Sequence, residues 1–469
     1  MAPNLRVKVL EQCKVSPSPP DSMAELTIPL SFFDMSWLSF QMLQMVLFYD
    51  FPHIMLETNI IPDLKSSLSL FLKHYLPFAG NLIYPTNSPN KPILRYIQGD
   101  SIHVTFAESN QDFHYLKGNQ PRNADDFFPL LPQSPQISKE SDAKVIPLAA
   151  IQVTFFPGSG LSIGLIGHHI LGDGIAILNG VKAWSSMHKL GTEKANKLLA
   201  GKCLAILDRS LISDKDGLAE KHWNKMKNNI RLINFDQPNN PLISNGNNKV
   251  LATFVLEKID LEKLKNFVVQ KSRKKDIYVS SFTVTCAYFW TCFVKSGISI
   301  GEEIVDNNTD EYFIAAIDCR SRVKPRVPEN YFGNCIAPCI IKSNHELLAS
   351  NEEGFVNAAI IIGDALSKKV QNEKGLLEDA KSWLSNIESV KMGRFFGVTG
   401  SPKMEIYELD YGWGKPEKVE ILSILSNQTM SLNKARRSEG GLEVGLALPK
   451  TKMEAFEKIF NNGLMNMKF

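Results

Sequence analysis

The sequence predicts an α/β protein with two domains, and three observations support this prediction. The chain has 469 residues, which is longer than a chain that folds around a single hydrophobic core. We therefore expect two domains of roughly 200 residues each. Strand and helix patterns alternate in both halves, as in α/β proteins. Between the halves the periodicity weakens and Asn and Lys become frequent. We therefore expect an N-terminal domain (1–201), a crossover (202–248) and a C-terminal domain (249–469).

Residues 1–167 contain one predicted amphipathic helix and four predicted strands. Apolar residues recur at three- and four-residue steps over residues 64–75, which predicts a helix. Residues 94–98 and 102–108 are predicted strands. Residues 150–156 and 161–167 are two further β-prone runs, and the Pro-Gly-Ser-Gly between them is typical of a tight hairpin turn.

The segment HHILGDG at 168–174 directly follows the last of these strands, and a helical pattern that ends at Gly191 follows it. A strand, a short polar loop and a helix in that order commonly place reactive side chains at a sheet edge. Histidine is the usual general base near neutral pH, so His168 and His169 are candidates. Successive strand residues face opposite sides, so only one of the two can point into a given site.

The second half repeats the alternation of strands and helices. Residues 251–257 and 312–318 are predicted strands, and residues 260–271 and 280–296 are predicted helices. The pattern indicates an α/β architecture without specifying the order of the strands.

Composition excludes several classes of protein. Hydrophobic residues make up 44% and charged residues 22% of the chain, as in ordinary soluble globular proteins. The net charge of +3 is too small to predict a nucleic-acid partner. The N-terminal segment lacks the apolar core of a signal peptide, and no apolar run is long enough to span a membrane. We therefore expect a cytoplasmic protein without a membrane partner.

The seven cysteines form no C-x-x-C pair and have no histidine at ligand spacing. Most lie inside hydrophobic segments, where buried reduced thiols are the usual state. We therefore expect no metal site.

One motif suggests a different chemistry. Residues 160–164, Gly-Leu-Ser-Ile-Gly, match the nucleophile elbow of serine hydrolases. That motif requires a sharp turn from a strand into a helix. Ser162 instead falls inside a predicted strand that continues beyond it, so a structural role is favoured.

Three segments could meet the phosphates of a substrate or cofactor. Basic clusters occur at 271–276 and 434–437, although such clusters are usually solvated surface. At Ser401 and Lys403 a turn offers a hydroxyl, backbone amides and an ammonium close together. The glycine-rich DYGWGKP at 410–416 is more typical of a structural corner.

These segments together resemble the plant BAHD acyltransferases. HHILGDG matches the family's H-x-x-x-D signature and DYGWGKP its D-F-G-W-G signature, with Tyr411 in place of the family's Phe. NYFGNC at 330–335 resembles the branch that acylates anthocyanins and other flavonoid glucosides. The likeness runs nearly end to end, and SSFTVTCAYFWTC at 280–292 also belongs to it.

The resemblance implies a two-domain fold like that of chloramphenicol acetyltransferase, with mixed sheets and a solvent channel between the domains. It implies that His169 lies midway along the channel and acts as general base. A sugar hydroxyl is a poor nucleophile at neutral pH, so removing its proton during attack on a thioester suits a neutral imidazole. Donor and acceptor would meet in a ternary complex, and a coenzyme A thioester would be a co-substrate with no permanent cofactor.

The resemblance also assigns roles to further residues. Asp173 joins His169 in the catalytic motif, either as partner in a His–Asp dyad or, as we favour, in an ion pair with Arg320. Asp410 and Trp413 are expected in the channel wall, with a direct catalytic part for Asp410 as the weaker alternative. The expected contacts of the cofactor's phosphates and pantetheine arm are Ser280, Ser281, Ser401 and Lys403.

The predicted function is transfer of a malonyl group onto a sugar hydroxyl of an anthocyanin, flavonoid or related phenolic glucoside, by a monomer. A malonyl carboxylate would favour a nearby cation, yet residues 174–177 are apolar, so a hydroxycinnamoyl donor is the alternative. Two readings from other classes are a non-catalytic small-molecule-binding relative and a serine hydrolase that uses Ser162.

Overall fold

The computed structural model describes most of the chain. Residues 228–247, which form much of the expected crossover, lie outside the described residues, so the three-part division stays a prediction. The described residues are 6–18, 25–38, 42–51, 60–86, 90–134, 136–201, 203–227, 248–274, 277–302, 309–371, 376–390 and 394–467.

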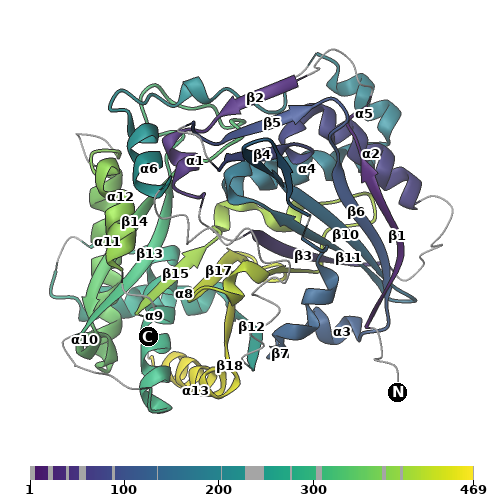
Figure 1. Cartoon of the computed structure of the whole chain (residues 1–469). Coiled ribbons are helices and arrows are strands. Elements are labelled where there is room, and N and C mark those ends of the chain that lie inside the picture. The colour runs from purple at the N-terminus through teal and green to yellow at the C-terminus, as the bar shows by residue number, and fades with distance from the viewer. Residues whose placement is uncertain are drawn as a thin grey trace.

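A six-stranded mixed sheet forms the frame of the N-terminal half (Figure 1). Its central strands β10 and β11 form an antiparallel hairpin, and both are buried along their whole length because the sheet is covered on both faces. In spatial order the strands are β1 (Val7–Val15), β6 (Ile102–Ser109), β10 (Ala149–Phe156), β11 (Gly160–Gly167), β3 (Leu43–Asp50) and β16 (Lys418–Ile421).

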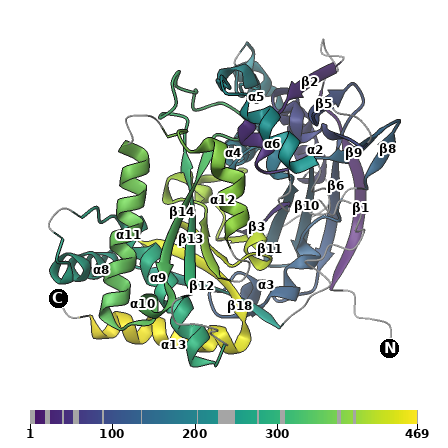
Figure 2. The same cartoon turned by 60° about the vertical axis from the view of Figure 1, so that its left-hand side comes forward.

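A seven-stranded mixed sheet forms the frame of the C-terminal half. Figure 2 shows its strands β13 and β14 side by side, with α11 and α12 lying against them. In spatial order the strands are β14 (Ile336–Asn344), β13 (Asp310–Asp318), β15 (Phe395–Thr399), β17 (Thr429–Lys434), β18 (Leu442–Pro449), β12 (Lys249–Leu256) and β7 (Arg122–Asn123).

A smaller five-stranded sheet lies in the N-terminal half. Its strands are antiparallel, and several alternate between more and less buried positions. In spatial order they are β2 (Glu25–Pro29), β5 (Ile93–Ile97), β4 (Asn81–Pro85), β9 (Ala143–Pro147) and β8 (Ser138–Glu140).

Each half of the chain contributes one strand to the other half's sheet. β16, from the C-terminal half, pairs antiparallel with β3 at the edge of the first sheet. β7, from the N-terminal half, pairs with β12 at the edge of the second. The buried ion pair between Arg122 of β7 and Glu420 of β16, 2.7 Å apart, links these two exchanged strands. The two halves are therefore joined through backbone pairing and not only through side chains.

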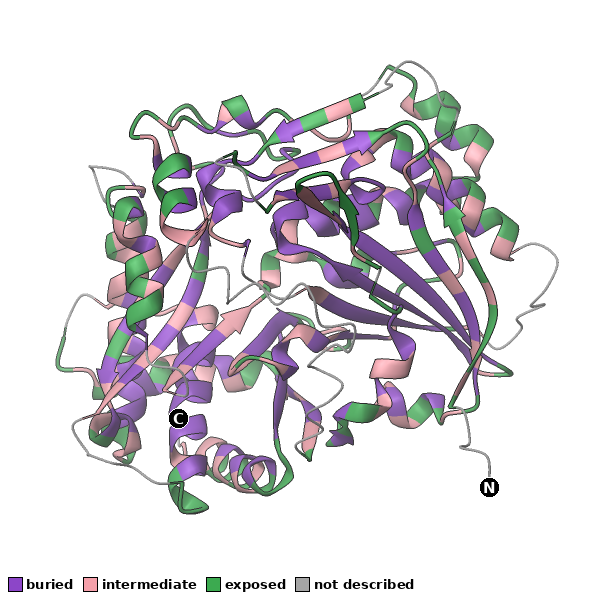
Figure 3. Cartoon of the chain, in the orientation of Figure 1, coloured by how far each residue is buried: buried purple, intermediate pink, exposed green. Residues whose placement is uncertain are grey.

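Helices cover the sheets, and the exposed residues of these helices lie on the outside of the molecule (Figure 3). α2 packs against α4 on the first sheet, and α9, buried along most of its length, packs against α8, α11 and α13. The helices are α1 (Phe32–Met35), α2 (Ile60–His74), α3 (Phe113–Leu116), α4 (Gly174–Leu190), α5 (Thr192–Leu199), α6 (Leu218–Met226), α8 (Lys258–Lys271), α9 (Ser281–Ser299), α10 (His345–Ala349), α11 (Glu352–Gln371), α12 (Trp383–Ser389) and α13 (Lys450–Asn466).

The elements predicted from local pattern are present. The helix expected at 64–75 is the main part of α2, and the hairpin expected at 150–167 is β10 and β11. The helix after HHILGDG is α4, and Gly191 ends it as expected, with φ of 79°. The mixed α/β fold class is confirmed.

Candidate active site

The HHILGDG loop leaves the buried end of β11 and leads into α4. His169 to Leu171 form one turn of 3₁₀ helix (η4, His169–Leu171). Asp173 then caps α4, because its carboxylate accepts a hydrogen bond from the backbone amide of Ala176 at 3.0 Å. The loop therefore has a fixed path at both ends.

The two adjacent histidines have different roles in this loop. The Nδ1 atom of His168 accepts a hydrogen bond from the backbone amide of Ile170 at 3.2 Å, so this ring caps η4. The Nδ1 atom of His169 instead lies 3.1 Å from Oδ1 of Asn334. The two rings thus serve different partners, although β11 ends at Gly167 and strand alternation therefore does not apply to either histidine.

His169 is held between an aromatic ring and a polar side chain. The indole of Trp37 stacks on the imidazole with ring centroids 3.8 Å apart and planes 6° from parallel. His169 is 8% exposed. Burial lowers its pKa to about 4, although hydrogen bonding to its own backbone carbonyl and the charge of Asp173 oppose the shift. The imidazole is therefore neutral at physiological pH, as a general base must be.

The Asp173 carboxylate pairs with Arg320 and does not form a dyad with His169. Arg320 Nη1 lies 2.9 Å from Asp173 Oδ2, and Arg320 Nη2 donates to Asp173 Oδ1 at 3.0 Å. The backbone amide of Cys335 also donates to Asp173 Oδ2, at 2.9 Å. Both charged side chains are almost fully buried. The ion pair implied by the resemblance is present, and it joins the HHILGDG loop to the C-terminal half beside β13 and β14.

A second buried ion pair also contacts the segment 333–335. Arg209 Nε lies 2.9 Å from Asp34 Oδ2, and the backbone amide and Nδ2 of Asn334 donate to Asp34 Oδ1 at 3.1 and 2.9 Å. Asn334 Nδ2 also donates to the backbone carbonyl of His169 at 2.9 Å. Asn334 therefore contacts both the ring and the backbone of His169.

Four further residues belong to this site and were not among the residues predicted from the sequence: Asp34, Trp37, Arg209 and Asn334. Asn334 lies in NYFGNC, which was recognised as a branch marker without a role for any of its side chains. Asp34 belongs to a Ser-x-x-Asp capping box at the start of α1, a pattern that is visible in the sequence. Arg209 has no local signal, because its partner is 175 positions away.

The residues expected to bind coenzyme A occupy two helix starts. Ser280 caps α9 by accepting a hydrogen bond from the amide of Thr283, and Ser281 is the first residue of that helix. Ser401 caps the 3₁₀ turn η8 (Pro402–Met404), which carries the exposed Lys403. η8 lies against the start of α4, since a Cβ atom at Gly174 would be only 2.7 Å from Met404 Cε. The structure therefore brings Ser401 and Lys403 close to the HHILGDG loop.

Asp410 is anchored at the far end of α4. Its carboxylate accepts hydrogen bonds from the backbone amides of Gly412 and Gly414 at 2.8 and 3.1 Å and from Lys189 at 2.6 Å. Lys189 is in the last turn of α4, whose 17 residues span about 25 Å. Asp173 caps the opposite end. The structure therefore does not bring Asp410 together with His169, and its contacts are those of a residue that shapes its own loop.

Trp413 packs inside the same loop. Its ring stacks on that of Tyr411 with planes 9° from parallel, and it meets His188 of α4 edge to face. His188 Nδ1 also lies 2.6 Å from the backbone oxygen of Tyr411. The DYGWG segment is thus a packed corner against the end of α4, and its place in a channel wall stays a prediction.

Ser162 is buried in the middle of β11. It is fully enclosed, and its backbone lies between Thr154 of β10 and Phe48 of β3. A strand with partners on both sides has no elbow that could expose a hydroxyl. The geometry therefore opposes the serine hydrolase reading.

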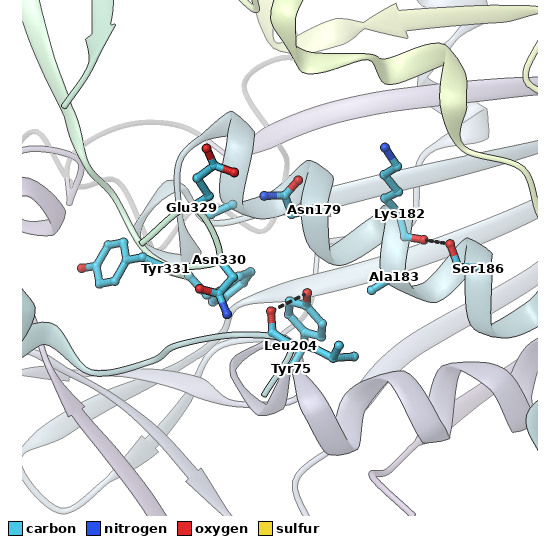
Figure 4. Close-up of a pocket in the computed structure, with 11 residues that line it drawn as sticks. Tyr75, Asn179, Lys182, Ala183, Ser186, Leu204, Glu329, Asn330 and Tyr331 are labelled. Carbon is cyan, nitrogen blue, oxygen red and sulfur yellow. Dashed lines mark hydrogen bonds between the residues drawn. The ribbon is translucent and has the colours of Figure 1, made fainter. Parts of the chain in front are cut away.

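A cavity of about 330 Å³ adjoins the site along α4 (Figure 4). Its wall begins at Ala176, one turn beyond Asp173, and continues along α4 to Lys182 and Ser186. Residues 329–332, just before Gly333, form another part of the wall. No predicted site residue lines this cavity, and the expected solvent channel stays a prediction.

Three further features bear on the class of protein. All seven cysteines are free thiols. Within the described ranges, no helix is both long and apolar enough to cross a membrane. The same ranges contain no cluster of three or more His, Cys, Asp or Glu side chains placed to hold a metal ion.

Comparisons with known proteins identify the family of the chain and several relatives. Residues 5–462 match the model of the Transferase family. A malonyl-coenzyme A:anthocyanin 3-O-glucoside-6''-O-malonyltransferase from Dahlia pinnata is 40% identical, covering 98% of each chain. Phenolic glucoside malonyltransferase 1 from Nicotiana tabacum is 42% identical, covering 97% of this chain and 99% of the relative. The crystal structure of vinorine synthase is similar in fold, with a TM-score of 0.64, 17% identity and 96% of each chain covered.

The family match and these relatives together show that the chain is an acyltransferase enzyme. The chain belongs to the Transferase family, which confirms the resemblance of its motifs to the BAHD acyltransferases.

Proposed function

We propose that this enzyme transfers a malonyl group from malonyl-coenzyme A to a sugar hydroxyl of an anthocyanin or related phenolic glucoside. The observation that carries the proposal is the neutral imidazole of His169, which is buried where the HHILGDG loop meets residues 333–335. The relatives from Dahlia and Nicotiana, whose names state malonyl transfer to such glucosides, support this choice of donor and acceptor.

The proposed reaction needs one base and no covalent enzyme intermediate. The sugar hydroxyl transfers its proton to His169 while its oxygen forms a bond to the thioester carbonyl carbon. The tetrahedral intermediate then collapses, the carbon–sulfur bond breaks, and the imidazolium returns the proton to the leaving sulfur. The products are a malonyl ester of the sugar and free coenzyme A. A positioned base of this kind contributes on the order of 100- to 10,000-fold to the rate.

Asp173 contributes by holding the loop and not by touching the substrates. Its carboxylate is used by Arg320, by the amide of Cys335 and by the amide of Ala176. These contacts fix the path of the chain immediately after His169. A fixed base lowers the entropic cost of bringing two substrates together.

Coenzyme A is the proposed co-substrate, and Ser401, Lys403, Ser280 and Ser281 are its proposed contacts. Lys403 is exposed and supplies an ammonium beside the start of α4. The two serines stand at the N-terminal end of a 19-residue helix, where backbone amides and the helix dipole favour an anion.

A hydroxycinnamoyl donor is the second candidate. The apolar residues from Gly174 to Ile177 at the start of α4 favour it, because they offer no cation for a malonyl carboxylate. We also propose that the enzyme works as a monomer in the cytoplasm, and the free state of its cysteines supports that compartment.

The test is a matrix of donors and acceptors. The purified enzyme is incubated with malonyl-, coumaroyl- or acetyl-coenzyme A and with anthocyanin or simple phenolic glucosides, and products are identified by mass. We expect malonylated glucoside and acceptor-dependent release of coenzyme A. Release that does not depend on the acceptor would indicate a hydrolase, and no release with any pair would indicate a non-catalytic relative.

A further inference from the structure

We propose that Asn334 is a positioning residue that sets the tautomer of His169, and that Asp34, held by Arg209, sets the orientation of the Asn334 amide. The inference deepens the proposed function, since it rests on His169 acting as the base. The four side chains form one continuous series of hydrogen bonds, Arg209 to Asp34 to Asn334 to His169. All four are buried.

The carboxylate of Asp34 decides which way the Asn334 amide points. A carboxylate paired with an arginine only accepts hydrogen bonds. The Asn334 atom 2.9 Å from Asp34 Oδ1 is therefore the amide nitrogen Nδ2, which donates. The same nitrogen donates to the backbone carbonyl of His169, which is also a pure acceptor. Two acceptors thus fix the amide in one orientation and leave its oxygen facing the imidazole.

The amide oxygen then decides the tautomer of His169. Oδ1 of Asn334 lies 3.1 Å from Nδ1 of His169, and an amide oxygen cannot donate. Nδ1 must therefore carry the proton. A neutral imidazole protonated on Nδ1 has its lone pair on Nε2, so this arrangement selects Nε2 as the basic nitrogen.

His168, the adjacent histidine of the same loop, has a different partner at Nδ1. Its Nδ1 atom accepts a hydrogen bond from the amide of Ile170, so its ring has the opposite tautomer, with the proton on Nε2. The two histidines are adjacent and both are buried. Nδ1 of His168 faces an amide of the same loop, whereas the ring of His169 faces two acceptors, its own backbone carbonyl and the Oδ1 atom of Asn334, which comes from a segment 165 positions away.

Arg209 holds the far end of the series. Its guanidinium lies against the backbone at Gly333, where a Cβ atom would be only 2.5 Å from Cζ of Arg209. It donates to Asp34 and to the backbone carbonyl of Phe332. The absence of a side chain at residue 333 thus lets the cation approach the segment that carries Asn334.

The kinetic test uses Asn334→Ala and Asn334→Leu, of which the second keeps the volume if the first leaves a cavity. A base that is misplaced or in the wrong tautomer is expected to lower kcat by about 100-fold, with the KM for malonyl-coenzyme A unchanged. The matched control is Asn344→Ala, which removes the amide that caps α10. That control is expected to lower stability, because an N-cap is lost, and to leave kcat unchanged.

The spectroscopic test is nitrogen NMR of protein labelled with ¹⁵N-histidine, with the His169 signals identified by their loss in His169→Gln. Wild-type His169 is expected to be protonated on Nδ1, and both Asn334 variants are expected to show mixed tautomers. A wild-type kcat, or a reduced kcat with an unchanged tautomer, would overturn the inference. Full turnover by His169→Gln would instead overturn the proposed function, and the NMR comparison would still decide whether Asn334 sets the tautomer.

Discussion

The backbone amides of Asn334 and Cys335, adjacent in the chain, donate to two different buried carboxylates. The Asn334 amide donates to Asp34 and the Cys335 amide to Asp173. Each carboxylate also has an arginine, Arg209 for the first and Arg320 for the second. The two ion pairs therefore hold residues 333–335 at two adjacent backbone amides, and Asn334 in turn contacts His169.

The Asp173–Arg320 pair predicts a large effect on stability. Asp173→Asn keeps a side chain that can cap α4 but leaves Arg320 as a buried charge with reduced compensation. Breaking a buried pair in this way costs about 3–5 kcal/mol. Denaturant unfolding should show this loss, and activity should fall with the disorder of the loop.

Asp318→Asn is the matched control for that variant. Asp318 is the second carboxylate partner of Arg320, at 3.0 Å, but its side chain is 35% exposed. Its removal should cost less than about 1 kcal/mol. A folded Asp173→Asn protein with an ordered loop, normal stability and no turnover would contradict the structural role of Asp173.

The buried histidines predict a loss of stability in acid. Burial, together with the neighbouring His169, lowers the pKa of His168 to about 3, and burial lowers that of His169 to about 4, both from 6.5. Below pH 6.5 these two histidines become protonated in the unfolded chain but stay neutral in the folded chain. The free energy of unfolding therefore decreases as the pH falls from 6.5 toward 4. His168→Asn can still cap η4 but has no imidazole to protonate. Denaturant titrations of this variant should therefore show a smaller difference in the free energy of unfolding between pH 7 and pH 5 than those of the wild-type protein. The exposed His114→Asn is the control and should leave it unchanged.

Asp410 is predicted to support its loop without taking part in the chemistry. Burial alone would raise its pKa, but hydrogen bonds from Lys189, Gly412 and Gly414 outweigh burial and the pKa is lowered. Asp410→Ala leaves two amides without their acceptor and should cost about 1–3 kcal/mol of stability, with little change in the kcat of the folded protein. A loss of kcat on the order of 1,000-fold at unchanged stability would show that Asp410 is catalytic.

Lys403 is predicted to contribute to donor binding alone. A cation that binds a phosphate stabilises the bound donor equally in the ground state and in the transition state. Its removal therefore raises KM and leaves kcat unchanged. Lys403→Ala should therefore raise the KM for malonyl-coenzyme A about tenfold, equivalent to about 1.4 kcal/mol. The exposed Lys381→Ala is the control. An unchanged KM would remove Lys403 from the donor site.

The local elements of the fold could be predicted because their signals are local. The hairpin of β10 and β11, the helix α2 and the end of α4 at Gly191 each depend on residues within a short window. The pairing of β16 with β3 could not be predicted in this way, because it joins residues more than 350 positions apart whose sequences do not specify each other.

The same limit applied to the site. His169 and Asp173 could be found because the H-x-x-x-D motif lies in one loop, and Arg320 only because the resemblance supplied it. Trp37, Asp34 and Arg209 reach the site through tertiary contacts that no periodicity reveals. Asn334 lay inside a recognised motif, but its role depends on the carboxylate and the imidazole that it bridges.

The most direct measurement is the turnover of His169→Gln with malonyl-coenzyme A and an anthocyanin glucoside, beside a titration of its coenzyme A affinity. With the base removed and the donor site intact, we expect kcat to fall on the order of 100- to 10,000-fold at unchanged affinity for coenzyme A. Turnover close to that of the wild-type enzyme would contradict the assignment of His169 as the base.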